Sequence, residues 1–224
     1  WIWSNLKDIC DRGVLRFLLN SIMLSTGATA IAMLCGIPAA YAMARMHFKG
    51  RSLFLGFVIM SQMFSPVVLL VGISQLMNTL HLNDTILGLM LINAAFNQAF
   101  AIWLLRGTFV SISPEMEQAA CIDGCNTVGA LWHILLPMAA PGIVTTLIFV
   151  FINAWNDYFL QLIMLNSQSK LTISLGIAKM QAEASTDFGL IMAGATLASV
   201  PIITIFLIFQ KYFTKGITLG AVKG

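Results

Sequence analysis

Charged side chains are scarce in this sequence. Asp, Glu, Lys and Arg make up only 9% of its 224 residues, against about 25% in soluble domains. Hydrophobic residues make up 58%, and the mean hydropathy is +0.88. So few charges cannot cover the water-facing surface of a soluble chain of this length, which excludes that class. We therefore expect a polytopic membrane protein.

Metal-binding patterns and the common catalytic motifs are also missing. Cys10, Cys35, Cys121 and Cys125 form no C-x-x-C pair and have no histidine cluster beside them, which argues against a metal site. The net charge is only +3, and the basic residues flank apolar runs, so nucleic acid is not an expected partner. No G-x-x-x-x-G-K-S/T, H-E-x-x-H or G-x-S-x-G motif occurs. We therefore expect no enzyme activity and no catalytic residue in this chain.

Five apolar runs are long enough to cross a bilayer, whose core of about 30 Å takes about 20 helical residues. Runs of this length predict helices rather than the short alternating strands of a barrel. The expected fold class is an all-α, polytopic transmembrane helical bundle that forms a single domain over residues 1–224. The runs are Phe17–Ala44, Ser52–Asn83 with a short exit loop, Thr85–Leu105, Ile134–Asn156 continuing past Asp157 toward Leu165, and Phe188–Gln210.

Lysine and arginine in the short loops predict the orientation, because loops rich in them stay in the cytoplasm. The loop 45–51, the segment after Arg106 and the tail 211–224 carry these residues, whereas the loop after the second run has none. Three basic residues before Phe17 and two lysines between the fourth and fifth runs oppose this assignment. The orientation places the first residue outside, as if one earlier helix preceded it. The chain also begins without Met, so an upstream segment is expected.

The segment 111–137, between the third and fourth runs, is too polar to cross a bilayer but is typical of a short helix. Ser113 is a suitable N-cap, Pro114 suits the first helical position, and two glutamates in the first turn complement the helix dipole. Gly124 is the expected stop, because a left-handed residue costs least at glycine. The chain is then expected to turn and to re-enter the membrane at Pro137. A rigid element joined to two spans can pass movement from a cytoplasmic partner into the membrane.

This segment resembles the EAA loop of ABC importer permeases, whose pattern is Glu-Ala-Ala, three residues, Gly, nine residues, Ile-x-Leu-Pro. Glu117 is matched to the glutamate of the pattern, and Gln118, in place of its first Ala, is the one departure. In that family the EAA helix sits in a cleft on an ATPase subunit. The resemblance implies that Glu117 makes the polar contact to the ATPase and that Gly124 supplies the turn. The positions assigned to ATPase coupling are Glu117, Ala119, Ala120, Asp123, Gly124, Ile134, Leu136 and Pro137.

Two further stretches resemble the carbohydrate branch of these permeases. Ala154–Phe159 is similar to its Trp-Asn-(Glu/Asp)-Phe signature, and residues 210–224 resemble the C-terminus of MalG-like subunits of maltose transporters. Those subunits have six spans with both ends in the cytoplasm, of which five are visible here. The resemblance implies an inner (plasma) membrane permease that moves a sugar or oligosaccharide by alternating access. The implied partners are a second, MalF-like permease, two ATPase subunits that hold ATP and Mg, and an extracytoplasmic solute-binding protein, with no cofactor on this chain.

Several polar side chains fall inside the apolar runs, where they are costly and often functional. Asn93 and Asn97 are four residues apart and share one helix face. Amides combined with aromatic rings suit a sugar, which offers hydroxyls and flat C–H surfaces. The same amides can instead hold helices together through hydrogen bonds of about 1 kcal/mol each. The candidate translocation-path residues are Asn93, Asn97, Asn153, Trp155, Asn156 and Asp157.

An ion-gradient-driven secondary transporter of a small polar solute is the main alternative. Such a transporter would be expected to pair carboxylates within the membrane for proton or sodium coupling. Asp157 stands nearly alone among the apolar runs. The sequence therefore favours the ABC permease over the secondary transporter.

Overall fold

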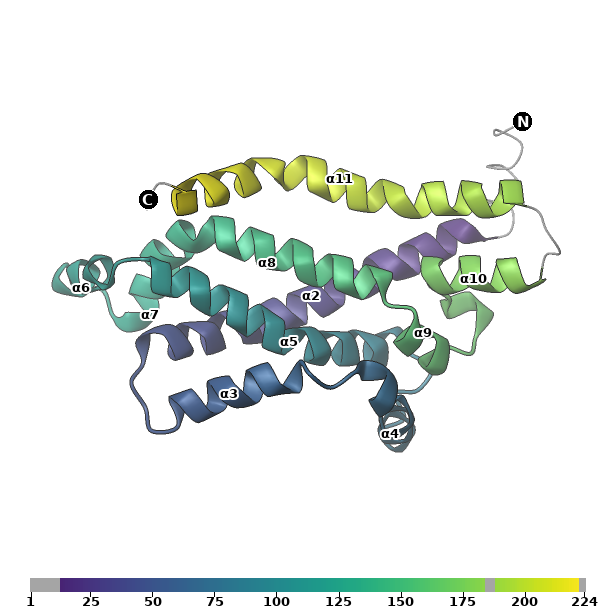
Figure 1. The fold of residues 1–224 in the computed structure, drawn as a ribbon, viewed down its shortest axis with the longest axis horizontal. Helices are drawn as coiled ribbons and strands as arrows, with labels where there is room; N and C mark the ends of the chain where they lie inside the picture. The colour runs from purple at the N-terminus through teal and green to yellow at the C-terminus, as the bar shows by residue number, and fades with distance from the viewer. Residues whose placement is uncertain (1–12, 184–187, 222–224) are drawn as a thin grey trace.

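The computed structural model describes residues 13–183 and 188–221, and these ranges contain helices and no strand. Each of the four long helices belongs to a helical stretch long and apolar enough to cross a bilayer. The expectation of an all-α transmembrane bundle is therefore confirmed. These helices run along an elongated bundle (Figure 1): α2 (Val14–Arg45), α5 (Ile86–Ser111), α8 (Leu136–Asn156) and α11 (Phe188–Ala221).

Small side chains let α2, α5 and α8 approach one another at the centre of the bundle. Ala32 of α2, Ala94 and Ala101 of α5 and Val150 of α8 form a buried cluster where the three helices meet. In lipid, helices associate through such close packing, because the surrounding acyl chains are as apolar as their side chains. Helix α11 lies along α8 on the outside of this core.

The two ends of the bundle carry different short helices (Figure 1). The end called here the α6 end holds the C-terminal ends of α2, α5 and α11 together with α6 (Pro114–Ile122) and α7 (Thr127–Ala130). The opposite, α10 end holds the start of α2 together with α9 (Phe159–Met164), the 3-10 turn η2 (Gln168–Lys170) and α10 (Ile173–Glu183). Arg106 Nε donates to Met43 O at 3.3 Å near the α6 end. The loop 45–51 and Arg106, both expected in the cytoplasm, therefore share one end.

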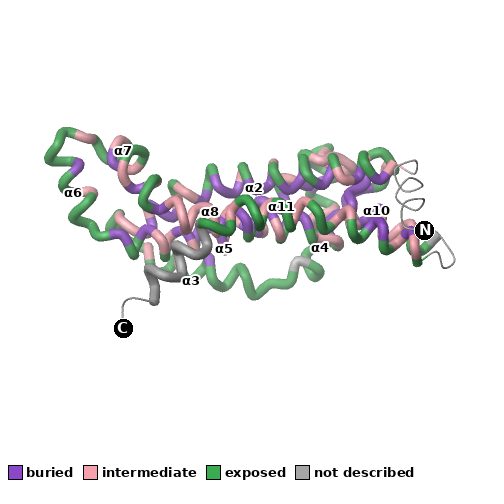
Figure 2. The backbone as a smooth tube through the Cα atoms, turned by 90° about the horizontal axis from the view of Figure 1, so that it is seen from above, coloured by how far each residue is buried: buried purple, intermediate pink, exposed green. Residues whose placement is uncertain are grey.

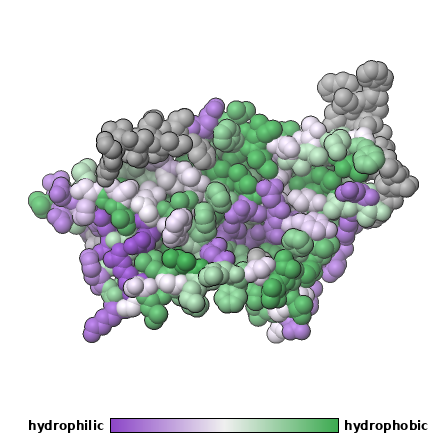
Figure 3. Space-filling view, viewed as in Figure 1, coloured by the Kyte–Doolittle hydropathy of each residue, from purple (hydrophilic) through white to green (hydrophobic). Residues whose placement is uncertain are grey.

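Large apolar side chains cover the outside of α3 (Arg51–Ser61) and α4 (Pro66–Thr79). Leu53 is 81% exposed and Val68 is 78% exposed, and the stretch from α3 to α4 is exposed almost throughout (Figure 2). Hydrophilic side chains instead gather at the α6 end of the face drawn in Figure 3. A surface of this kind fits lipid or a partner subunit on the flanks and water at the α6 end.

The second apolar run, Ser52–Asn83, was wrongly predicted as one span. Helix α3 ends at Ser61, and α4 begins at Pro66 after a turn. The two helices have 11 and 14 residues, about 16 and 21 Å, so neither crosses a core of about 30 Å alone. Pro66 favours the start of a new helix here, because proline has no N–H to donate to a preceding turn and suits the first position of a helix. The prolines within α2, α8 and α11 leave those helices continuous.

The fourth span differs from the prediction at both ends. The helix re-enters at Thr127 rather than at Pro137, and a π-helical turn over Leu131–Leu135 precedes α8. A wider turn at this place accommodates Pro137, whose ring would otherwise meet the preceding carbonyls. At the other end α8 stops at Asn156, because Asp157 is extended (φ −64°, ψ 122°). The stretch toward Leu165 forms the separate helix α9.

Asp84 joins two loops at the α10 end. Its carboxylate accepts hydrogen bonds from the backbone N–H groups of Asn166 and Ser167, both at 3.0 Å, and from the Ser167 hydroxyl. Lys170 Nζ lies 3.0 Å from Asp84 Oδ2. These donors, the Ser167 hydroxyl foremost, hold the pKa of Asp84 well below its usual range. The loop before α5 is thereby fastened to the loop after α9.

Asp84→Asn should therefore destabilise the α10 end at neutral pH. Folding lowers the pKa of Asp84, so its ionised carboxylate stabilises the folded state fully at pH values above the pKa of the unfolded chain, about 3.9. This stabilisation is lost as the pH falls through the pKa of the folded state. We expect the free energy of unfolding to fall by about 1–2 kcal/mol at pH 7. The lower melting temperature should be measurable in detergent, with a difference from wild type that shrinks below about pH 4. Asn166→Ala, which keeps the donating backbone N–H, should melt like the wild type, and an unchanged Asp84→Asn would contradict the assignment.

Candidate functional site

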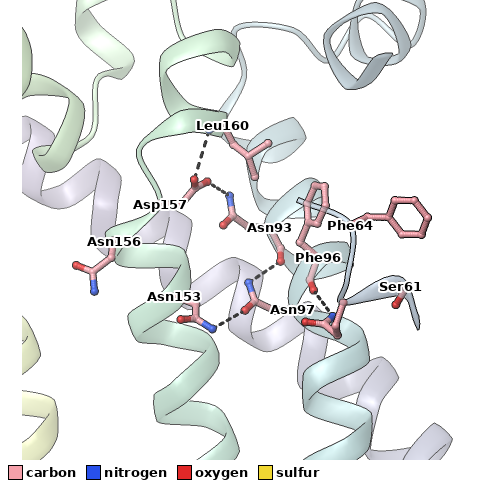
Figure 4. A pocket seen from close by; sticks show the side chains of 10 residues that line it. Ser61, Phe64, Asn93, Phe96, Asn97, Asn153, Asn156, Asp157 and Leu160 are labelled. Carbon is pink, nitrogen blue, oxygen red and sulfur yellow. Dashed lines mark hydrogen bonds between the residues drawn. The ribbon is translucent and has the colours of Figure 1, made fainter. Parts of the chain in front are cut away.

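A polar cavity of about 320 Å³ opens between the end of α3, the first half of α5 and the end of α8 (Figure 4). Its polar wall consists of amides and one carboxylate, and none of its lining residues is Lys, Arg or His. Groups of this kind can donate to and accept from the hydroxyls of a neutral solute. The cavity is lined by Ser61, Gln62, Phe64, Asn93, Phe96, Asn97, Asn153, Asn156, Asp157 and Leu160.

Four of these side chains form a hydrogen-bonded ladder between α5 and α8. Asn93 Nδ2 donates to Asp157 Oδ2 at 3.2 Å, and Asn153 Nδ2 donates to Asn97 Oδ1 at 3.1 Å (Figure 4). Asn93 and Asn97 are four residues apart on α5 and therefore share one face, while Asn153 lies on α8 and Asp157 is the residue that ends it. The structure thus brings Asn93 and Asn97, which were expected on one helix face, together with the candidate path residues Asn153 and Asp157. It also contains the interhelical hydrogen bonds that were the alternative explanation for these amides.

Asp157 is the C-cap of α8 and lies in the short link before α9. Its Oδ1 atom accepts from the backbone N–H of Leu160, in the first turn of α9, at 3.4 Å. Its Oδ2 atom accepts from Asn93. The carboxylate therefore lies in the cavity wall between α8 and α9, held by one backbone and one side-chain donor.

The aromatic wall of the cavity is not the one that the sequence indicated. Trp155 was a candidate path residue, but it is only 1% exposed, stacks on Phe151 and belongs to the hydrophobic core. It does not line the cavity. Phe64 and Phe96 line it instead. Phe96 could have been found from its position between Asn93 and Asn97, whereas Phe64 precedes the break at Pro66 and gave no signal.

The second candidate region is α6, which projects from its end of the bundle (Figures 1 and 2). The Ser113 hydroxyl accepts from the Glu115 N–H at 3.4 Å, and Pro114 is the first helical residue. Gly124 has φ +91° and stops the helix. Cys125 N donates to Ala120 O and Gly124 N to Cys121 O, the two bonds of a Schellman motif. The predicted cap, first residue and stop of this helix are confirmed.

The two faces of α6 have different surroundings. Glu117 and Ala120 face the bundle, and Ala120 is buried. Gln118, Ala119, Ile122 and Asp123 are exposed, with Ile122 at 85%. The remaining coupling positions lie in the helical stretch after the turn, where Ile134 and Leu136 are half-buried and Pro137 is exposed.

Glu117 makes its contacts within its own chain. Its Oε1 atom accepts from the Tyr41 hydroxyl, and its Oε2 atom lies 3.2 Å from Arg45 Nε. In the EAA pattern three residues separate the second alanine from the glycine. With the glycine at Gly124, the two alanines are Ala119 and Ala120, and the glutamate falls at position 118, where this chain has Gln. The sequence alignment of Glu117 with that glutamate was therefore wrong by one residue. A step of one residue is about 100° around a helix, so Gln118 points outward where Glu117 points inward.

Comparisons with known proteins bear on the whole bundle. The family described as the binding-protein-dependent transport system inner membrane component matches residues 18–219. The chain is 35% identical over 224 residues to the probable ABC transporter permease protein YurM of Bacillus subtilis, covering all of this chain and 75% of the relative. It is 37% identical over 209 residues to the trehalose transport system permease protein SugB of Mycobacterium tuberculosis, covering 92% and 76%.

A solved structure shares the fold. It is a bacterial ABC transporter involved in the import of the acidic polysaccharide alginate, with a TM-score of 0.82 at 24% identity, covering 94% of this chain and 79% of that chain. The arrangement of α2, α5, α8 and α11 is thus that of an ABC importer permease. By its matched family and its relatives, this chain belongs to the binding-protein-dependent transport system inner membrane components, the permease subunits of ABC importers.

Proposed function

We propose that this chain is one permease subunit of an importer that moves a sugar or oligosaccharide across the inner membrane by alternating access. Separate ATPase subunits drive the movement, and no ATP or Mg is held by this chain. The observation that carries the proposal is α6, a capped helix that projects from the bundle with an exposed apolar residue, Ile122, at its tip. Such a helix offers a rigid contact surface for a soluble motor.

The connections of α6 lead directly to both walls of the cavity. On one side Ile112 and Ser113 join α6 to α5, which carries Asn93 and Asn97. On the other side the turn at Gly124 leads through α7 to α8, which carries Asn153. A displacement of α6 therefore moves the ends of α5 and α8 to which it is joined, and can change the position of one helix relative to the other. This is the geometry that alternating access needs.

The polar cavity forms one wall of the translocation path in this proposal. Amides, a carboxylate and two phenyl rings can bind the hydroxyls and C–H faces of a sugar. The opposite wall comes from a second permease, which packs against the apolar flank of α3 and α4. The relatives SmoH, SugB and DasC, named for sulfoquinovosyl glycerol transport, trehalose transport and diacetylchitobiose uptake, support a carbohydrate as the solute.

The α6 end lies in the cytoplasm in this proposal, together with the C-terminal end of α11. The basic residues Arg45, Arg51 and Arg106 near this end support that orientation. The α10 end then faces the extracytoplasmic solute-binding protein. A bacterial alginate ABC transporter of similar fold has been solved in complex with an alginate pentasaccharide-bound periplasmic protein.

Uptake by the assembled transporter tests this function. The permease pair, ATPase subunits and binding protein are reconstituted in vesicles, and uptake of labelled trehalose or another di- or oligosaccharide is measured. We expect uptake with ATP, none with a non-hydrolysable analogue, and no effect of dissipating proton or sodium gradients. Uptake that persists without ATPase subunits, or that is lost when the proton or sodium gradient is dissipated, would establish the secondary transporter instead.

A further inference from the structure

Glu117 is anchored to two residues of α2 that lie four apart on one face. Tyr41 donates its hydroxyl to Oε1, and Arg45 Nε lies 3.2 Å from Oε2, so each carboxylate oxygen has its own partner. The side chains of Arg45 and Glu117 are only 11% and 16% exposed. The attraction within a largely buried ion pair is screened less by salt and water than that of an exposed pair. Removing one partner leaves a charge buried without a counterion, which destabilises the protein.

Arg45 extends this contact to a third helix. Its Nη2 atom donates to Ile112 O at 2.8 Å, and Ile112 is the C-cap of α5. The Tyr41 ring meets Phe109 of α5 edge to face, with centroids 6.1 Å apart. The ends of α2, α5 and α6 are thus held at one point. This set of contacts, Tyr41–Arg45–Glu117 with Ile112, is called the latch below.

Helix α2 is also fastened at its other end. Asn20 Nδ2 donates to Leu171 O at 2.8 Å and to Ser169 O at 3.1 Å, and Ser21 Oγ accepts from Ile173 N at 2.8 Å. These bonds join α2 to η2 and to the start of α10. The helix has 32 residues, about 48 Å, so it reaches from one end of the bundle to the other.

The proline inside α2 is braced by a neighbouring helix. Pro38 removes one donor from the helical ladder. With its amide turned to satisfy both groups, Gln98 of α5 donates to Ala32 O at 3.3 Å and accepts from Gly36 N at 3.0 Å. Ala32 and Gly36 precede Pro38, so this contact ties α2 to α5 on the N-terminal side of the proline.

We infer that Glu117 is a positioning residue that locks α6 to α2, so that α2 carries movement of α6 across the membrane to η2 and the start of α10. The inference rests on the proposed function. Glu117 acts within the permease, and the ATPase meets the opposite face of α6, around Gln118 and Ile122. Binding-protein contact at the α10 end and ATPase contact at the α6 end are thereby coupled through one helix clamped at both ends.

A charge-swap cycle tests the latch in the reconstituted complex. The variants are Arg45→Glu, Glu117→Arg and the double variant, and the readouts are ATPase co-purification, basal ATPase rate and stimulation of that rate by the loaded binding protein. We expect each single variant to keep its ATPases and to lose about tenfold in stimulation, equivalent to about 1.4 kcal/mol of coupling. The double variant should recover most of the stimulation, because the pair is restored with its charges exchanged.

Milder variants keep the test decisive if a charge reversal prevents folding. Glu117→Gln keeps the shape and removes the charge, and Glu115→Gln is its matched control, since Glu115 is exposed in the same turn. Glu117→Gln should reduce stimulation and Glu115→Gln should not. Loss of the ATPases in Glu117→Arg without rescue by Arg45→Glu, or full stimulation in Arg45→Glu, would overturn the latch. Failure of the wild type to take up solute with ATP would instead overturn the proposed function.

Discussion

Ile122→Asp should abolish ATP-driven uptake while leaving the permease folded in the membrane. Ile122 is 85% exposed at the end of α6, so the change removes no packing within the chain. In the complex, a carboxylate in an apolar docking site loses its hydration without gaining a partner. Residues at the centre of an interface cost about 2–4 kcal/mol when truncated, about 30- to 1000-fold in Kd. Co-purification of the ATPase subunits with the variant permease measures this loss.

Graded substitutions at the same position provide the control. Ile122→Leu keeps the volume and apolar character and should retain both ATPase binding and uptake. Ile122→Ala should fall between leucine and aspartate, since it removes contact area without adding a charge. The melting temperature of the permease alone should be the same in all three variants. Normal ATPase association in Ile122→Asp would show that the outward face of α6 is not the docking surface.

The parts of the fold that local chemistry dictates were predictable from the sequence. The extent of α2 and the start of α11 follow from uninterrupted apolar runs, and α6 follows from an N-cap, a first-position proline and a glycine stop. Asn93 and Asn97 were placed on one face by helical spacing alone. These features depend on residues within a few positions of one another. Periodicity and capping are sufficient to describe them.

The features that depend on distant residues were not predictable in this way. The break before Pro66 was not predicted, because hydropathy alone does not separate a single span from two short helices. Trp155 was expected beside the sugar path but packs on Phe151 in the core. The inward direction of Glu117 is set by Arg45, 72 positions earlier in the chain. Spacing within one helix cannot reveal such a partner.

Gly142→Val should disrupt the bundle itself. Gly142 lies where α8 crosses α5, and a Cβ atom there would lie 2.1 Å from Thr108 Oγ1 and 2.4 Å from Thr108 Cγ2. Threonine is β-branched and stiff at χ1, so the two helices must separate to admit the valine. Such overpacking costs about 1–3 kcal/mol. The hydrogen-bonded ladder and the connections to α6 both depend on α5 and α8. Gly142→Val should therefore lower both the melting temperature of the permease and the rate of uptake.

Two companion variants isolate the clash from the general effect of placing valine in a helix. Gly107 immediately precedes Thr108 on α5 and is exposed, and a Cβ atom at this position would meet no neighbouring side chain within 4 Å. Gly107→Val should therefore leave a single, well-folded peak in size-exclusion chromatography, where Gly142→Val gives aggregate. Combining Gly142→Val with Thr108→Gly removes the opposing side chain and should recover the peak. If the two glycine variants behave alike, or Thr108→Gly gives no rescue, the contact between α5 and α8 does not set their spacing.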